Sequence, residues 1–184
     1  DIVIGNPPYV STKNISDAMK KNLEKEFNFV DDLYSHFFFK GLSLLKKNAN
    51  LCYITSKTYW TIQTKKNLRE LLLSKTINYI FDTASPFEAA MVDTCIISIK
   101  NASTEENLIV FLDGKQDLKK PKEYSVQQSI YKNAQNSVIF TPNEYNMHIY
   151  KLYGKRIRQL YNVWWDKIKT SRDIEKNKKE LEEY

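Results

Sequence analysis

Short apolar runs alternate with polar segments of helical periodicity over the first hundred residues, and this alternation restricts the possible folds more than any other feature of the sequence. The runs predict strands at residues 1–4, 51–55, 77–82 and 92–99. The segments between them predict helices at residues 16–27, 31–47 and 64–74. Because a helix between two strands implies parallel neighbours and a right-handed crossover, we predict an α/β fold with a mostly parallel sheet.

The first and the last of these predicted strands are expected to differ in their place in the sheet. The run DIVI at residues 1–4 is expected to be a short buried strand. The loop at residues 83–91 is too short for a crossover, so the strands on either side of it should pair antiparallel. We therefore expect the antiparallel strand at residues 92–99 to form an edge of the sheet.

The pattern is looser after residue 100. It predicts a strand at residues 108–113, a lysine-rich loop at 114–125, a short strand at 138–140, and helices at 143–165 and 170–184. We expect residues 1–113 to form the second half of an α/β domain. Residues 114–184 are expected to form a linker and the start of a helical region, a candidate for target recognition.

Composition places few limits on function. The net charge of +6 and the sequence pI near 9.1 suit a polyanionic partner, although many basic proteins have none. Cys52 and Cys95 lie inside apolar runs and are expected to be buried small hydrophobic residues. No metal is predicted, because the acidic residues have no metal-ligand spacing. The sequence contains no stretch typical of a membrane span or a signal peptide, which predicts a cytoplasmic protein.

The tetrapeptide Asn6-Pro7-Pro8-Tyr9 follows the first predicted strand and carries the most chemical information. Ligands of open α/β sheets bind outside the carboxyl ends of the strands. Two prolines stiffen the turn and remove two backbone donors. The Asn6 side-chain oxygen and the Pro7 carbonyl could each accept one hydrogen of an exocyclic amine, and Tyr9 offers a flat face. Such acceptors would make the amine more nucleophilic.

The segment IGNPPY resembles motif IV of the amino methyltransferases, which transfer methyl from S-adenosylmethionine to a nitrogen. The run from Asp32 through Phe37 to the strand LCYIT resembles motifs V and VI of the adenine-N6 DNA branch, as found in restriction–modification enzymes. The resemblance implies a partial Rossmann-like fold, and it implies that Tyr34 and Phe37 line the adenine pocket of the cofactor. The alternative is that both are core residues of an amphipathic helix.

Pro86-Phe87 and the strand that follows resemble motif VIII of the same branch. The resemblance implies that Phe87 stacks on one face of a flipped target base while Tyr9 stacks on the other. Enzymes that modify a base must take it out of the helical stack, so a pair of aromatic residues has a clear purpose. A Phe87 that only caps the core is the alternative.

The resemblance covers about residues 1–100 and departs from the family in two places. Asn48-Ala49 replaces a usual glycine pair, and no glycine-rich cofactor loop precedes the first strand. The sequence begins at Asp1 directly in a strand, so we expect it to be a piece of a longer enzyme that is inactive alone. The expected partners are double-stranded DNA and other domains or subunits of a restriction–modification enzyme. RNA, a protein glutamine amide and a non-catalytic assembly role are the alternatives.

Overall fold

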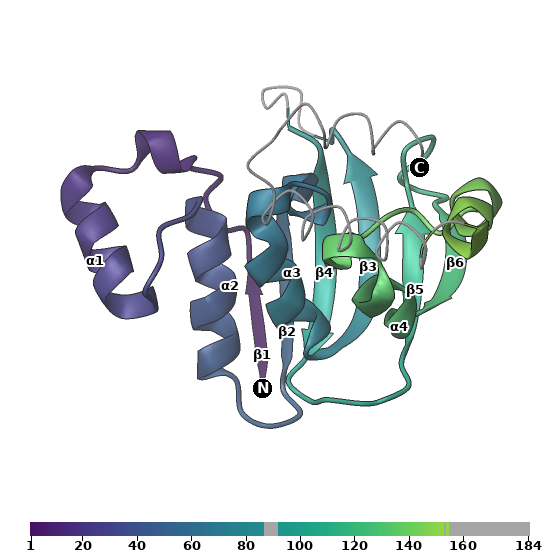
Figure 1. Cartoon of the computed structure of the whole chain (residues 1–184), viewed down its shortest axis with the longest axis horizontal. Helices are drawn as coiled ribbons and strands as arrows, with labels where there is room; N and C mark the ends of the chain where they lie inside the picture. The colour runs from purple at the N-terminus through teal and green to yellow at the C-terminus, as the bar shows by residue number, and fades with distance from the viewer. Residues whose placement is uncertain (87–91, 153, 155–184) are drawn as a thin grey trace, which may run out of the picture.

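The computed structural model describes residues 1–86, 92–152 and 154, and six strands in this part of the chain form a mixed sheet (Figure 1). Their order across the sheet is β1-β2-β4-β3-β5-β6. The strands are β1 (Ile2–Gly5), β2 (Asn50–Ser56), β3 (Thr76–Ala84), β4 (Thr94–Lys100), β5 (Leu108–Asp113) and β6 (Lys122–Gln127). The predicted α/β class is confirmed, and the strands found up to residue 113 lie where the sequence predicted them.

The position of β4 corrects one sequence prediction. β1 pairs parallel with β2, and β3 pairs parallel with β5. β4 is antiparallel, as predicted, but it lies between β2 and β3 and pairs with both of them instead of forming an edge. Its alternate residues Cys95, Ile97 and Ile99 are fully buried, which suits a central strand.

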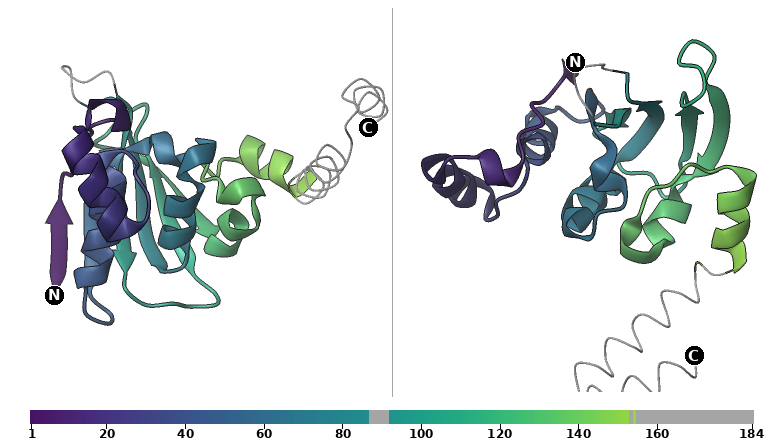
Figure 2. Two further views of the ribbon diagram at one scale, coloured as in Figure 1. Left: turned by 60° about the vertical axis from the view of Figure 1, so that its left-hand side comes forward. Right: turned by 90° about the horizontal axis from the view of Figure 1, so that it is seen from above.

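Three helices cover one face of the sheet, as the view from above shows (Figure 2). They are α2 (Leu33–Leu44), α3 (Lys66–Leu73) and α4 (Gln128–Asn133). α1 (Asp17–Phe27) lies beyond α2, away from the sheet, and Ser16 caps it by accepting a hydrogen bond from the Met19 amide. Short 3-10 helices flank the longer elements at Thr12–Asn14, Lys57–Trp60, Gln63–Lys65 and Gln135–Ser137.

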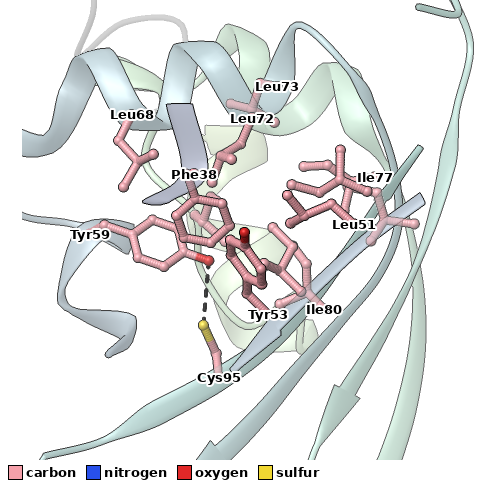
Figure 3. Close-up of a cluster of buried hydrophobic side chains, with 14 of the residues drawn as sticks. Phe38, Leu51, Tyr53, Tyr59, Leu68, Leu72, Leu73, Ile77, Ile80 and Cys95 are labelled. Carbon is pink, nitrogen blue, oxygen red and sulfur yellow. Dashed lines mark hydrogen bonds between the residues drawn. The ribbon is translucent and has the colours of Figure 1, made fainter. Parts of the chain in front are cut away.

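The main hydrophobic core lies between this helical layer and the sheet (Figure 3). The buried stripe of α2 consists of Tyr34, Phe38 and Leu42, which recur every four residues. Gly41 lets α2 approach β2 closely, because a β-carbon there would lie 2.7 Å from Leu51 Cδ1. Phe37, which the alternative interpretation assigned to the core face of this helix, is 41% exposed.

β1 is not the buried strand that its composition predicted. Ile2 is 67% exposed and Ile4 is 78% exposed. β1 pairs with β2 alone among the described residues, and the described helices cover one face of the sheet (Figure 2). Val3 packs against the core on that face, so strand alternation directs Ile2 and Ile4 to the other face. Apolar content therefore identified the strand correctly but not its burial.

The segment after β5 differs from its prediction in two places. β6 occupies the second part of the predicted lysine-rich loop and pairs antiparallel with β5, so the sheet continues past residue 113. Residues 138–140 are not a strand. Ile139 is buried there, and its amide donates to the Trp60 carbonyl at 2.9 Å. Residues 144–152 are helical, within the helix predicted at 143–165. The helix predicted at 170–184 lies outside the described residues. The domain boundary near residue 113 stays a prediction.

Asn48 lies in the turn at which the family that the sequence resembles usually has a glycine pair. Its φ angle is 66°, in the left-handed region that glycine and asparagine tolerate best. Its amide donates to the Asn101 carbonyl at 3.0 Å. Asn48 therefore adopts in the turn into β2 a backbone conformation that glycine also adopts readily.

His36 is buried in an aromatic cluster between α1 and α2 and is 3% exposed. Its ring stacks on Phe29 at 4.7 Å and lies 4.9 Å from Phe27. The Asp31 amide donates to Nε2 at 3.0 Å, so this nitrogen carries no proton in the folded state. Burial lowers the pKa of His36.

This environment predicts that acid weakens the fold in the range where free histidine titrates. Unfolded His36 takes up a proton below about pH 6.5, whereas the folded residue resists it. The free energy of unfolding should therefore fall as pH is lowered from 7.5 to 5.5, as measured by urea titration. His36→Phe should flatten this dependence, and His148→Gln, at an exposed position, should not. Equal slopes in the three proteins would contradict the prediction.

Candidate functional site

The carboxyl ends of β1, β2, β3 and β5 lie at one edge of the sheet, and Asn6–Tyr9 follow β1 at that edge (Figure 1). Asn6 and Pro8 are exposed, Pro7 is buried, and Tyr9 is partly buried. Gly5 precedes them with its backbone against the Tyr53 ring, where a β-carbon would lie 3.1 Å from Cε1. The tetrapeptide is thus presented at the end of a strand with the Asn6 amide open to solvent.

The Tyr9 ring is tied to the neighbouring strand. Its hydroxyl donates to the Ile54 carbonyl of β2 over a long 3.4 Å contact. Burial, with a smaller contribution from Cys95, raises the pKa of Tyr9, so the phenol keeps its proton at neutral pH. The hydroxyl anchors the ring at its tip, and part of the ring stays accessible.

The two aromatic residues predicted to line a cofactor pocket have different environments. Tyr34 is 2% exposed, and its hydroxyl lies 3.2 Å from Thr58 Oγ1. Lys65 covers its ring, with Nζ 5.4 Å from the centroid. Phe37, three residues later on α2, is 41% exposed. Of this pair, Phe37 has a face that a ligand can reach in the present arrangement.

Phe87, the predicted second stacking residue, lies outside the described residues. β3, which leads to it, ends at the same edge of the sheet as β1. Ala84, at the end of β3, has a φ angle of 51°, which is unusual for a residue with a β-carbon. The structure thus shows where the predicted motif VIII loop leaves the sheet.

Sequence reasoning missed a set of charged residues at this edge. Lys57, directly after β2, contacts Asp82 at the end of β3 at 3.0 Å and Asp93 before β4 at 2.9 Å. Burial disfavours the charge on Lys57, but the two carboxylates outweigh it and raise its pKa. Lys115, after β5, lies 3.5 Å from Asp82. Each of these residues ends or begins a strand at this edge, and that placement was the signal that could have identified them.

These ion pairs link the carboxyl ends of β2, β3 and β5. Asp82 is almost fully buried, with 1% of its side chain exposed, so it needs both lysines as charge partners. The cluster fixes the edge of the sheet beside the tetrapeptide. We interpret it as a structural support of the site.

Residues 1–86, 92–152 and 154 contain no group of three or more potential metal ligands. No helix in the same residues has both the length and the apolar composition needed to cross a bilayer.

Residues 1–88, which include the tetrapeptide, α2 and all of β2 and β3, match the Eco57I restriction-modification methylase family. The resemblance to restriction–modification methyltransferases is confirmed. The Type II methyltransferase M.HincII of Haemophilus influenzae is 27% identical over 143 residues, covering 71% of this chain and 28% of that protein. M.BstVI of Geobacillus stearothermophilus, also a Type II methyltransferase, is 34% identical over 94 residues, covering 48% of this chain and 17% of that protein.

A solved structure of a restriction–modification enzyme shares the fold. The Type IIL restriction-modification enzyme MmeI, determined in complex with DNA, superimposes with a TM-score of 0.53 at 19% identity. The match covers 68% of this chain and 18% of MmeI. This chain therefore spans less than a third of the length of M.HincII and of MmeI. The similarity supports the restriction–modification methyltransferase fold over the segment that contains the site.

Proposed function

We propose that this chain is the catalytic-motif half of a restriction–modification enzyme that transfers methyl from S-adenosylmethionine to the N6 amino group of adenine in DNA. The observation that carries the proposal is the placement of Asn6-Pro7-Pro8-Tyr9. It lies at the carboxyl edge of the sheet with an exposed amide, within the residues that match the methylase family.

In this proposal Asn6 and Pro7 act on the target amine. The Asn6 Oδ1 and the Pro7 carbonyl oxygen would each accept one hydrogen of the N6 amino group. Both acceptors sit on a turn whose two prolines limit its backbone freedom, so little reorganisation is needed when the base arrives. The amine lone pair would then be less delocalised into the ring and more nucleophilic.

Tyr9 and Phe87 would hold the extruded base. Each aromatic face that replaces a stacking neighbour contributes roughly 1–3 kcal/mol. The contact between the Tyr9 hydroxyl and Ile54 supports this role, because a ring anchored at its tip loses less freedom when a base stacks on it. Phe87 enters the proposal on the strength of the motif VIII resemblance alone.

The residues present fit part of a cofactor site. Phe37 offers an exposed aromatic face on α2 that could contact the adenine ring of S-adenosylmethionine, whereas Tyr34 would support this wall from beneath. When bound, S-adenosylmethionine would supply the electrophilic methyl group that the amine accepts. Among the described residues β1 has no strand on its second side, which fits the addition there of the further strands and the glycine-rich loop of a complete site.

We expect a specific product from the proposed reaction. The full-length polypeptide that contains this chain should incorporate labelled methyl from S-adenosylmethionine into a pool of duplex oligonucleotides, and nucleoside mass spectrometry should identify N6-methyladenine.

Cofactor binding is expected to need more than this chain. The 184-residue chain alone should show little thermal stabilisation by S-adenosylmethionine, and the full-length polypeptide should show a clear shift of its melting temperature.

Three outcomes would redirect the assignment. Methylation of RNA or of a glutamine-containing peptide in place of duplex DNA would change the substrate. N4-methylcytosine as the product would change the base. Strong stabilisation of the 184-residue chain by S-adenosylmethionine would contradict the proposal that another segment completes the cofactor site.

A further inference from the structure

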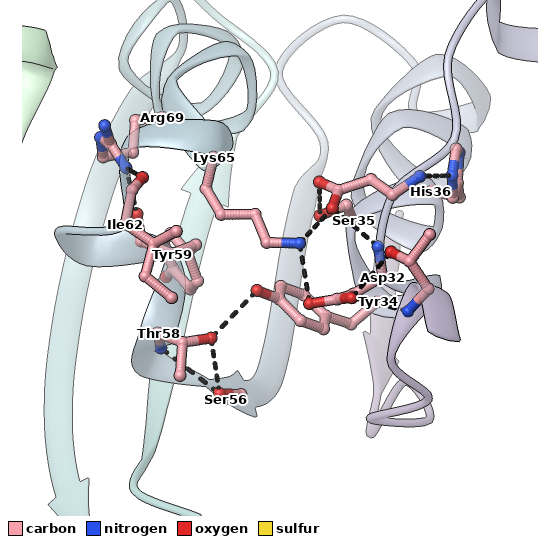
Figure 4. Close-up of polar contacts among 12 residues, drawn as sticks. Asp32, Tyr34, Ser35, His36, Ser56, Thr58, Tyr59, Ile62, Lys65 and Arg69 are labelled. Carbon is pink, nitrogen blue, oxygen red and sulfur yellow. Dashed lines mark hydrogen bonds and ion pairs between the residues drawn. The ribbon is translucent and has the colours of Figure 1, made fainter. Parts of the chain in front are cut away.

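We infer that Lys65 and Asp32 form an anchor that positions the backbone after Tyr9, so that Lys65 is a positioning residue for the site of the target base. The inference rests on the proposed function and deepens it. Lys65 immediately precedes α3 and lies 56 residues beyond Tyr9 in the sequence. The link between them runs through Asp32, which faces Lys65 in Figure 4, and through Thr12.

Asp32 is the first half of this link. It occupies the N-cap position of α2, yet its side chain makes no capping bond to that helix. Its Oδ1 accepts instead from the Thr12 amide at 2.9 Å and from the Thr12 hydroxyl at 3.0 Å. Asp32 therefore uses one carboxylate oxygen to hold the chain three residues after Tyr9.

Lys65 holds the other oxygen of Asp32. Its Nζ lies 2.8 Å from Asp32 Oδ2 and also contacts Asp31. The Lys65 side chain is only 5% exposed and lies over the Tyr34 ring. Burial opposes the charge on Asp32, but the Lys65 ammonium and the two Thr12 donors outweigh it and keep its pKa below the ordinary value. The buried lysine thus contacts two adjacent carboxylates at once and orients the Asp32 carboxylate.

A second set of bonds fixes the same stretch from its other end. The Leu33 amide donates to the Val10 carbonyl at 2.9 Å, and the Tyr9 hydroxyl reaches Ile54. Residues 9–12 are therefore held between β2 on one side and the start of α2 on the other. Without Lys65, Asp31 and Asp32 would repel each other, and the Asp32 carboxylate would have no charge to orient it toward Thr12.

Small displacements at this point have large consequences for a reaction that depends on alignment. A misplacement of about 1 Å can lower a rate by roughly 100-fold. Tyr9 is three residues from the anchored Thr12, so loosening the anchor should disturb the site of the target base. The expected signature is a larger effect on kcat than on the KM for S-adenosylmethionine, since Lys65 touches the proposed cofactor wall only through Tyr34.

Lys65→Met tests the anchor in the full-length protein, with Lys66→Met as the matched control. Lys66 is the next residue, is 48% exposed and pairs with Glu70 on its own helix. In Lys65→Met the Thr12 amide should exchange its hydrogen about tenfold faster, the effect expected from the loss of one hydrogen bond. The kcat for methyl transfer to duplex DNA should fall by about 10- to 100-fold. Lys66→Met should match the wild type in both measurements.

Thr12→Val provides a milder variant for the case in which Lys65→Met does not fold, since it removes only the hydroxyl bond to Asp32. All assays are run at a temperature at which circular dichroism shows the variant fully folded. The inference would be overturned if the Thr12 amide of Lys65→Met exchanged its hydrogen at the wild-type rate. It would also be overturned if Thr12→Val kept the wild-type kcat. A wild-type protein without methyl transfer would overturn the proposed function instead, and the exchange measurement would still decide whether the anchor exists.

Discussion

Replacing Asn6 by alanine is expected to lower the kcat of methyl transfer by about 100- to 1,000-fold, the effect typical of removing one preorganised polar group from a reacting centre. Asn6 is exposed at the end of β1, so the loss should not come from the fold. The unfolding midpoint and the KM for S-adenosylmethionine should stay close to those of the wild type, because the amide is proposed to act on the target amine alone. Single-turnover transfer to duplex DNA measures the effect on the chemical step directly.

Asn14→Ala is the matched control for this experiment. Asn14 is an exposed asparagine in the 3-10 helix that follows the tetrapeptide, and no role in transfer is proposed for it. Its replacement should leave kcat within about twofold of the wild type, as is usual for a surface substitution. A kcat for Asn6→Ala within tenfold of the wild type would mean that the Asn6 oxygen is not an essential acceptor.

The strands up to residue 113 were predictable because their signal is local, whereas β6 lies in a segment that the sequence predicted as a loop. The run LIVFLD is found as β5 at Leu108–Asp113, within the predicted bounds, and the short loop before residue 92 correctly predicted an antiparallel strand. The order of the strands was not predictable from the same signal. Periodicity says which residues form β4, but its place between β2 and β3 depends on pairing partners that lie on both sides of it.

Local sequence patterns also failed to predict which side chains of β1 and α2 are buried. Ile2 and Ile4 have the composition of a core, yet β1 has a free edge and an uncovered face in the described chain. On α2, Tyr34 and Phe37 both belong to a plausible apolar pattern. Only the docking of the helix on β2 decides that Tyr34 turns toward the core and Phe37 toward solvent.

Part of the candidate site could be predicted from the sequence, and part could be found only in the structure. Asn6 to Tyr9 are consecutive, so their combined chemistry could be inferred from the sequence. Lys65 and Asp32 are 33 residues apart and meet only after α2 and α3 have packed. Polar partners of this kind carry no periodic signal, and they are found only when the bonds of each buried charged group are traced in the structure.

Arg69 is the buried charged residue whose replacement should destabilise the fold most. It is fully buried, and its guanidinium donates to three backbone carbonyls: Tyr59 at 2.6 Å, Ile62 at 2.7 Å and Asn136 at 3.0 Å. Burial lowers the pKa of Arg69, since these partners are carbonyls and not carboxylates. The side chain thus joins the turn before α3 to the segment after α4.

Arg69→Met keeps much of the side-chain volume and removes all three donors. Each carbonyl left unsatisfied costs about 1–3 kcal/mol, and the relief of burying a charge offsets part of the sum. We expect a loss of about 3 kcal/mol in the free energy of unfolding, measured by urea titration. Glu70→Gln, at the next and exposed position of α3, should change it by less than about 0.5 kcal/mol, because its pair with Lys66 is a surface pair. An Arg69→Met protein as stable as Glu70→Gln would mean that water replaces the guanidinium at these carbonyls and that Arg69 does not hold the two segments together.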